Sequence, residues 1–247
     1  MTVRGGFESN DLLKHINFET IESAEKILFG FSDTSVLLNA MSLRIPKGKF
    51  IHGPNLMTFA QIGKRDITFD RFVMALNGQY DISPINFYGN YSDAGNTQLV
   101  ATNGVVALQE GVAEGKIWGG NLSSIQLLLG TPYMPQEERD IILFIEEDEL
   151  CGDDAPQMFK RALHHLAQQK IPLQVKGIIL GQFEVGSNIT PNFIKACLKD
   201  TGIFTNTPAA MNFMFGHTVP AGCFPIGGYC YLNITSSNSS VKIKDKK

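Results

Sequence analysis

Short apolar runs closed by turn residues alternate along this chain with segments whose composition suits helices. Residues 27–30 are apolar and end at Gly30, which predicts a buried strand. Residues 34–42 are apolar enough to predict a packed helix, and Ser32 and Asp33 just before them are the residue types that cap helix N-termini. This part of the chain therefore predicts a strand, a tight turn and a helix.

The same alternation continues through most of the chain. Further strands are predicted at 49–52, 112–118, 141–145 and 175–181, and further helices at 69–76, 122–129 and 157–169. The C-terminal remainder predicts short strands separated by turns. Strands that alternate with helices are typical of an α/β protein.

One long stretch breaks the pattern. Residues 77–103 are rich in Gly, Asn, Ser and Tyr and have little periodicity, which is typical of a long loop or an interdomain connection. We therefore expect a first unit at 1–78, a loop-rich connection at 79–110, a second unit at 111–236 and a polar tail at 237–247.

Composition narrows the class of protein. Of the 247 residues, 43% are apolar and 18% are charged, which suits a folded domain and is too apolar for disorder. The net charge is −3, and no basic cluster occurs before the C-terminal residues. The sequence therefore predicts no basic surface that would bind nucleic acid or an anionic membrane. With no signal-peptide pattern and no apolar run long enough to span a bilayer, we expect a cytoplasmic protein.

The cysteines give no sign of a metal site or a disulfide framework. They lie far apart, without a Cys-x-x-Cys pair, at Cys151, Cys197, Cys223 and Cys230. We expect reduced thiols, no metal and no cofactor.

A candidate nucleophile stands near the start of the chain, in the sequence Gly-Gly-Phe-Glu-Ser-Asn that ends at Asn10. The glycines permit a sharp turn and a close approach by substrate, and a following helix would aim its first N–H groups at a reacting carbonyl. Ser9 is therefore the candidate. The segment lacks the Gly-x-Ser-x-Gly pattern of a nucleophile elbow, and a serine that only caps a helix fits the same residues.

A nucleophilic serine needs a base and a carboxylate that orients the base. Of the five histidines, His217 lies in a segment crowded with turn residues, although a lone histidine is commonly structural. Glu146 directly follows the predicted strand 141–145, where a rigid element would hold its side chain. The acidic residues that follow also suit a solvated loop.

Seven segments together resemble the LD-carboxypeptidase family of serine peptidases, which includes murein tetrapeptide carboxypeptidases and microcin C immunity peptidases. They are 4–13 (RGGFESNDLL), 27–39 (ILFGFSDTSVLLN), 52–55 (HGPN), 118–135 (WGGNLSSIQLLLGTPYMP), 142–147 (ILFIEE), 177–184 (GIILGQFE) and 215–227 (FGHTVPAGCFPIG). The match covers nearly the whole chain. It implies a Rossmann-like N-terminal domain, a barrel-like C-terminal domain and an active site between them.

By position, the resemblance places the family's triad on Ser9, Glu146 and His217. It implies hydrolysis of an amide bond in a small peptide or peptidyl conjugate, through an acyl-enzyme whose oxyanion the backbone N–H of Asn10 helps to bind. Asn121 is placed like a substrate-side residue that binds a terminal carboxylate.

Further expectations of the resemblance concern recognition and assembly. Glu184 is a candidate for a substrate amino group. The block 52–55 and the segment 77–103, with Tyr80, Phe87, Tyr88 and Tyr91, resemble the microcin branch more closely. The aromatic side chains would stack on a nucleobase, although they would equally pack a long loop. A homodimer is compatible with the family.

The chain departs from the family at its start, because family members place several strands and helices before the nucleophile and here only residues 1–3 precede the matching segment. Without those elements the first unit would be incomplete, with strand edges and apolar faces left open. We therefore expect poor stability or low activity unless another segment or subunit completes it. The alternative function is a catalytically inactive family member that acts only in binding or structure.

Overall fold

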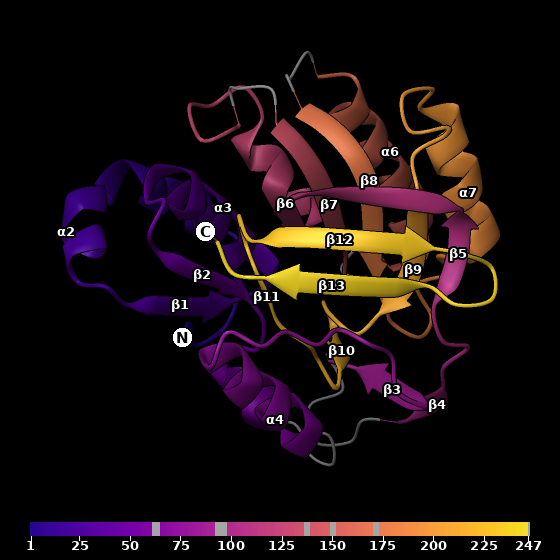
Figure 1. Cartoon of the computed structure of the whole chain (residues 1–247), viewed down its shortest axis with the longest axis horizontal. Coiled ribbons are helices and arrows are strands. Elements are labelled where there is room, and N and C mark those ends of the chain that lie inside the picture. The colour runs from indigo at the N-terminus through magenta and orange to yellow at the C-terminus, as the bar shows by residue number, and fades with distance from the viewer. Residues whose placement is uncertain (61–64, 92–97, 136–138, 149–151, 170–172, 247) are drawn as a thin grey trace.

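The computed structural model describes residues 1–60, 65–91, 98–135, 139–148, 152–169 and 173–246. Its N-terminal unit contains a small sheet in which β1 (Ile27–Gly30) and β2 (Lys49–His52) pair in parallel, joined by helix α3 (Ser35–Arg44) (Figure 1). The third strand, β11 (Phe224–Pro225), pairs antiparallel with β2 and comes from far along the chain. The C-terminal part of the chain therefore contributes the third strand of this sheet.

Short helical segments surround this sheet. They are α1 (Ser9–Leu12), α2 (Phe18–Ser23) and α4 (Arg65–Leu76), with single 3₁₀ turns η1 (Leu13–His15), η2 (Ser32–Thr34) and η3 (Leu56–Ala60).

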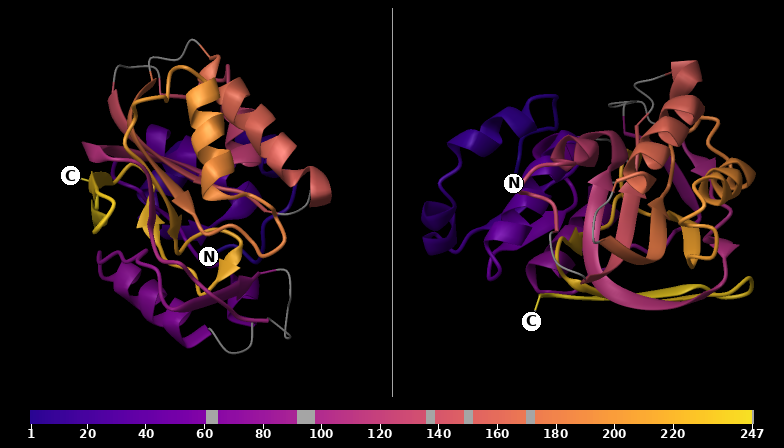
Figure 2. Two further views of the ribbon diagram at one scale, coloured as in Figure 1. Left: turned by 90° about the vertical axis from the view of Figure 1, so that its right-hand side faces the viewer. Right: turned by 90° about the horizontal axis from the view of Figure 1, so that it is seen from above.

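The larger sheet has seven strands in the order β13-β12-β6-β7-β8-β9-β5 and curls around its helices (Figures 1 and 2). Its central strands run in parallel and are β6 (Gly111–Asn121), β7 (Arg139–Glu146), β8 (Leu173–Gly181) and β9 (Ala209–Phe213). Antiparallel strands flank them: β5 (Val106–Gln109), β12 (Tyr229–Ile234) and β13 (Ser240–Lys244). A separate antiparallel sheet joins β3 (Phe87–Asn90), β4 (Val100–Ala101) and β10 (Thr218–Val219).

Helices cover the large sheet, which accounts for the apolar run in its strand β7. The helices are α5 (Leu122–Ile125), α6 (Ala155–Ala167) and α7 (Pro191–Asp200), with 3₁₀ turns η4 (Gln126–Leu128) and η5 (Gly152–Asp154). In Figure 2, α6 and α7 lie side by side on one face of the sheet. Residues 141–145 of β7 are all buried, as expected for a parallel strand covered on both faces. One continuous hydrophobic core joins the two halves of the chain.

The α/β architecture confirms the expected fold class, and each strand predicted by residue range is present. Three local expectations were wrong. The predicted helix 122–129 is divided into α5 and η4, the C-terminal part contains the ten-residue helix α7, and residues 240–244 of the expected tail form β13. The segment 79–110 contains three short strands, and the domain boundaries stay a prediction.

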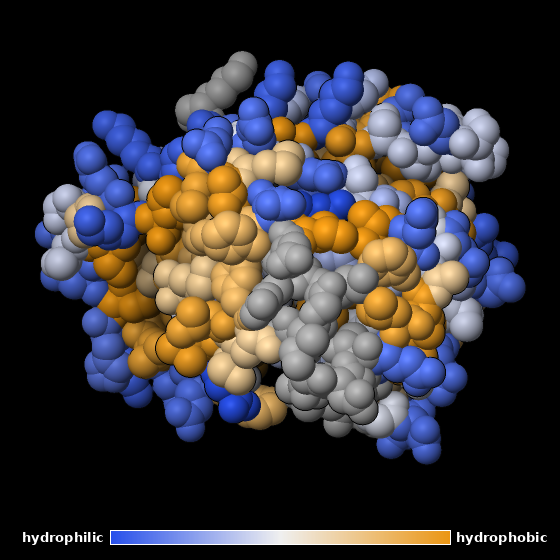
Figure 3. Space-filling view, turned by 90° about the horizontal axis from the view of Figure 1, so that it is seen from below, coloured by the Kyte–Doolittle hydropathy of each residue, from blue (hydrophilic) through white to orange (hydrophobic). Residues whose placement is uncertain are grey.

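Exposed apolar side chains gather in the N-terminal half, where Figure 3 shows a broad apolar area on the side of the molecule that holds α2, β1 and α4. The large exposed apolar residues in this half include Val3, Phe7, Leu12, Leu56, Met57 and Phe69, and the side chain of Phe7 is 77% exposed. A patch of this kind marks a surface suited to contact with another polypeptide segment.

The described cysteines Cys197, Cys223 and Cys230 are free and buried, whereas Cys151 lies outside the described residues. Within the described ranges, no helix combines the length and the apolar character needed to cross a bilayer.

Candidate active site

Two neighbouring parallel strands deliver polar side chains to the same edge of the large sheet. In the register of β6 and β7, Asn121 lies beside Glu146, and both residues end their strands. Both are buried. The carboxyl ends of parallel strands are the usual location of a binding site in an open α/β sheet. This edge of the sheet is therefore the candidate active site.

The closest polar contact at this edge joins Glu146 to His217. The Nδ1 of His217 lies 2.6 Å from Oε2 of Glu146, and both side chains are at least nine-tenths buried. Gly216 makes the approach possible, because its φ is +98° and a Cβ there would lie 2.9 Å from the same Oε2 atom. The loop before β10 therefore brings together two residues that are 71 positions apart in the sequence.

The electrostatics of this pair stabilise a positive charge on the imidazole, the form that His217 takes after it accepts a proton. Burial alone would raise the pKa of Glu146, but the charge and hydrogen bond of His217 outweigh it and hold the pKa below its ordinary value. Burial would likewise lower the pKa of His217, but Glu146 outweighs it and the pKa is raised, with smaller contributions from Asp148 and Glu184. A carboxylate that orients an imidazole and supports its positive charge is what a general base needs.

Three further groups face the imidazole of His217. Its Nε2 lies 3.5 Å from Oδ2 of Asp148. The ring of Phe31 meets it edge-on with centroids 4.9 Å apart, and the ring of Tyr91 lies 6.1 Å away. The backbone N–H of Tyr91 also donates to the carbonyl of His217. Aromatic walls limit the water that reaches the imidazole and fix its orientation.

His52 approaches the pair from the small sheet. Its Nε2 is 3.8 Å from Oε1 of Glu146, which is too long for a direct hydrogen bond. Both ring nitrogens of His52 and Oε1 of Glu146 are buried without a hydrogen-bond partner among the described residues. The ring stacks on Phe224, its antiparallel neighbour, with centroids 4.5 Å apart. The end of β2 therefore contributes a buried imidazole to the same site.

Ser9 begins helix α1, as the glycine turn before it predicts. The carboxylate of Asp33 accepts hydrogen bonds from the backbone N–H groups of Glu8, at 3.1 Å, and Ser9, at 2.9 Å. Gly5 permits close packing here, because a Cβ would lie 2.8 Å from the Cβ of Ser32. The expectation that Asp33 caps the helix after β1 was wrong: the cap residue of α3 is Thr34, and the Asp33 carboxylate instead holds the Ser9 turn.

The Ser9 turn and His217 are linked through the segment that follows β1. Asp33 contacts the turn, and Phe31, two residues earlier, packs against His217. Among the described residues, no hydrogen bond joins the Ser9 hydroxyl to the imidazole. The contact between nucleophile and base therefore stays a prediction.

Asn121 is held within the protein. Its side-chain oxygen accepts from the N–H of Ser124 and caps α5, and its Nδ2 donates to Glu147 at 2.8 Å. Its backbone N–H donates to the hydroxyl of Ser35. These bonds show a structural role for Asn121, and its predicted contact with a substrate carboxylate is untested. Glu184 is buried and contributes to the potential at His217, and its role also stays a prediction.

The tyrosines of the long connection have different surroundings. Tyr91 lies beside His217, and its hydroxyl donates to Asn55 at 3.1 Å. The hydroxyl of Tyr80 instead donates to the carboxylate of Asp245 near the C-terminus. Tyr80 is therefore engaged elsewhere, whereas Tyr91 borders the candidate site.

Sequence reasoning missed several side chains that the fold brings to the site. The sequence predicts a helix cap at Asp33 and a solvated acidic run at Glu147 and Asp148, and it assigns no catalytic role to His52. Glu147 is 7% exposed. A local signal existed only for His52, which ends an apolar strand just as Glu146 does. The spacing of the others in the sequence gives no sign that they meet.

A buried histidine–glutamate pair at the carboxyl edge of a parallel sheet, with a serine at the head of a nearby helix, defines a hydrolase-like α/β protein. Residues 1–53 match the family model described as the LD-carboxypeptidase N-terminal domain, and residues 114–232 match the LD-carboxypeptidase C-terminal domain. The chain belongs to the LD-carboxypeptidase family.

Similar proteins agree with this assignment. "Putative carboxypeptidase YocD" of Bacillus subtilis is 35% identical over 248 residues, which cover 98% of this chain and 75% of that protein. The crystal structure of an MccF-like protein from Bacillus anthracis superimposes with a TM-score of 0.91 at 33% identity, over 99% of this chain and 75% of that one. The structure of the microcin C7 self-immunity protein MccF of Escherichia coli, in complex with glutamyl sulfamoyl guanosine, gives a TM-score of 0.79 at 26% identity, with the same coverage.

Proposed function

We propose that this protein is a serine-type carboxypeptidase that hydrolyses an amide bond in a small peptidyl or aminoacyl conjugate, with Ser9, His217 and Glu146 as its triad. The observation that carries the proposal is the buried contact of 2.6 Å between His217 and Glu146 at the carboxyl edge of the sheet. Family membership supports the same chemistry, because the family model is that of a carboxypeptidase.

In the proposed reaction, Nε2 of His217 takes the proton of the Ser9 hydroxyl while Oγ attacks the amide carbonyl. A C–O bond forms, and the oxyanion is bound by the backbone N–H of Asn10. The C–N bond then breaks, and the imidazolium returns the proton to the leaving nitrogen. Water, activated by His217 in the same way, hydrolyses the acyl ester and releases Ser9.

For the substrate we favour an aminoacyl nucleotide-like conjugate over a murein peptide. The reported structural similarities are to MccF and an MccF-like protein, and MccF is seen with glutamyl sulfamoyl guanosine. Tyr91 and Phe31 offer aromatic faces beside His217, on which a flat base would stack. The carboxylate of Glu184 is proposed to accept hydrogen bonds from the amino group of the substrate. The side chain of Asn121 is proposed to lie next to the carboxylate of the substrate.

Labelling with a serine-directed fluorophosphonate tests the triad. We expect label on Ser9, and loss of label in Ser9→Ala and in His217→Ala, while Ser23→Ala on α2 serves as the matched control and keeps it. Absence of label from folded protein would favour the alternative of an inactive binding protein. Release of glutamate from glutamyl sulfamoyl guanosine, compared with release of D-alanine from a murein tetrapeptide, then decides between the two substrate classes.

A further inference from the structure

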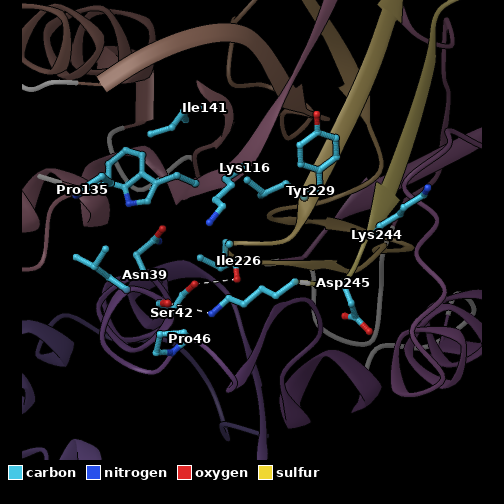
Figure 4. A pocket seen from close by; sticks show the side chains of 15 residues that line it. Asn39, Ser42, Pro46, Lys116, Pro135, Ile141, Ile226, Tyr229, Lys244 and Asp245 are labelled. Carbon is cyan, nitrogen blue, oxygen red and sulfur yellow. Dashed lines mark hydrogen bonds between the residues drawn. The ribbon is translucent and has the colours of Figure 1, made fainter. Parts of the chain in front are cut away.

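A cavity of about 860 Å³ lies away from the candidate active site, between α3, the middle of β6 and the start of β12 (Figure 4). Ser42 from α3, Lys116 from β6 and Tyr229 from β12 line it, together with the C-terminal segment. None of the triad candidates is among its lining residues. Asn121 ends β6 at the candidate site, five residues beyond Lys116, so the strand separates the two places.

The cavity is rich in positive charge. Lys116, Lys244 and Lys246 all line it. Asp245 is the lining carboxylate, but it is already engaged by Lys49, whose Nζ lies 3.3 Å away, and by the hydroxyl of Tyr80. The charge of Asp245 is therefore largely balanced outside the cavity, and the lysines leave an excess of positive charge inside it.

Lys246 is fixed at the wall of this cavity. Its Nζ donates to the carbonyl of Ser42 at 2.9 Å and to that of Ile45 at 3.4 Å, which are carbonyls at the end of α3. The ammonium also lies 5.4 Å from the centroid of the Phe50 ring. Burial, and then the neighbouring charge of Lys116, lower the pKa of Lys246 to about 8. An anion next to both lysines would relieve this repulsion.

A buried donor without a partner also lines the cavity. Trp118 is 5% exposed, and its Nε1 has no hydrogen-bond partner within the described ranges. Leaving such a group unpaired is unfavourable, and an acceptor oxygen on a ligand would remove that cost. The surrounding walls are apolar, with Ile141, Ile226 and Pro46 lining the same space. Indole and aliphatic walls suit a flat apolar group.

We propose that this cavity binds a small organic anion, with its negative group between Lys116 and Lys246 and a flat apolar part against Trp118. Carboxylate, phosphate and sulfonate groups share the chemistry required, since each offers several acceptor oxygens to ammonium and indole donors. The site is separate from the proposed peptidase chemistry and does not depend on it.

The fluorescence of Trp118, the single tryptophan of the chain, reports on this site directly. Phenyl phosphate is the probe, inorganic phosphate tests the charge alone, and benzyl alcohol tests the ring alone. We expect a saturable change with phenyl phosphate, weaker binding of inorganic phosphate and no saturation with benzyl alcohol. Equal binding of benzyl alcohol, or no saturable signal with phenyl phosphate, would overturn the proposal.

Variants locate the binding. Lys116→Gln, at an exposed position that tolerates the change, is expected to weaken phenyl phosphate about tenfold, the effect of losing one charge-assisted contact worth about 1.4 kcal/mol. Lys195→Gln removes the same charge from α7 and should leave the affinity unchanged. Ser9→Ala should also bind normally, because a loss there would place the probe in the candidate active site and refute a separate cavity. Calorimetry on Trp118→Phe should show weaker binding than the parent, and unchanged binding would exclude the indole contact.

Discussion

The buried carboxyl of Glu147 gives a sharp test of the electrostatics at the sheet edge. Its Oε2 accepts from the N–H of Ser123, at 2.9 Å, and from the hydroxyl of the same residue, at 2.7 Å, while Oε1 accepts from Asn121. Burial raises the pKa of Glu147 to about 7, opposed by the Ser123 bonds and assisted by the negative charges of Glu146 and Asp148. The carboxyl of Glu146, the last residue of β7, and that of Glu147, the next residue, thus have pKa values displaced in opposite directions.

The sign of the effect on stability follows from the raised pKa. The folded state binds the Glu147 proton more tightly than the unfolded state, so this group favours folding at low pH. That contribution is lost as the pH rises from the ordinary value of 4.5 to about 7. A difference of this size corresponds to about 3 kcal/mol in the free energy of unfolding, a substantial part of the stability of a typical domain.

Glu147→Gln removes the titration while keeping the shape and one acceptor oxygen for Ser123. Its amide nitrogen would face the donor of Asn121, which costs stability equally at every pH. We therefore expect the free energy of unfolding of the variant, measured relative to that of the parent, to rise by about 2–3 kcal/mol between pH 5 and pH 8. This change with pH is expected whichever of the two proteins is more stable at pH 5.

Urea unfolding followed by circular dichroism at pH 5, 6, 7 and 8 measures this difference. Glu19→Gln is the matched control, because it removes one negative charge at an exposed position in α2. If the parent and Glu147→Gln give parallel curves of unfolding free energy against pH, the assigned burial and charge environment of Glu147 are wrong.

Three further changes test the site. Glu146→Gln should lower kcat/KM on the order of 10⁴-fold and lower the pKa of His217 in an NMR titration, and an unaltered rate would remove Glu146 from the triad. Gly216→Ala should lower the melting temperature more than Gly104→Ala. Both glycines have a positive φ, but only the Cβ of an alanine at position 216 would meet another side chain, that of Glu146. Equal decreases in melting temperature would show that backbone strain alone acts. Asp33→Ala should slow fluorophosphonate labelling of Ser9 about tenfold, which corresponds to about 1.4 kcal/mol, because the Ser9 turn loses the carboxylate that holds it. Asp33→Asn keeps an acceptor oxygen and should keep most of the labelling rate. A normal rate in Asp33→Ala would contradict the positioning role of Asp33.

The elements that the sequence predicted correctly depend on local signals. Residues 27–30 and 141–145 are apolar runs long enough only for strands, and the structure has β1 and β7 there. The helix over 157–169 is present as α6, whose buried Phe159, Leu163 and Leu166 recur at helical spacing. The missed helix α7 also had a local signal, because Thr190 and Pro191 form a capped start.

By itself, the sequence determined the α/β class, the family and the identity of Ser9, Glu146 and His217 as candidates, because strand periodicity and motif order are properties of the chain. Only the tertiary structure decided which groups meet. The contact of His217 with Glu146 depends on a loop that returns from β9, and the Asp33 bond to the Ser9 turn spans 24 residues. Contacts of this kind are fixed by strand register and by the packing of buried side chains, and neither leaves a periodic trace in the sequence.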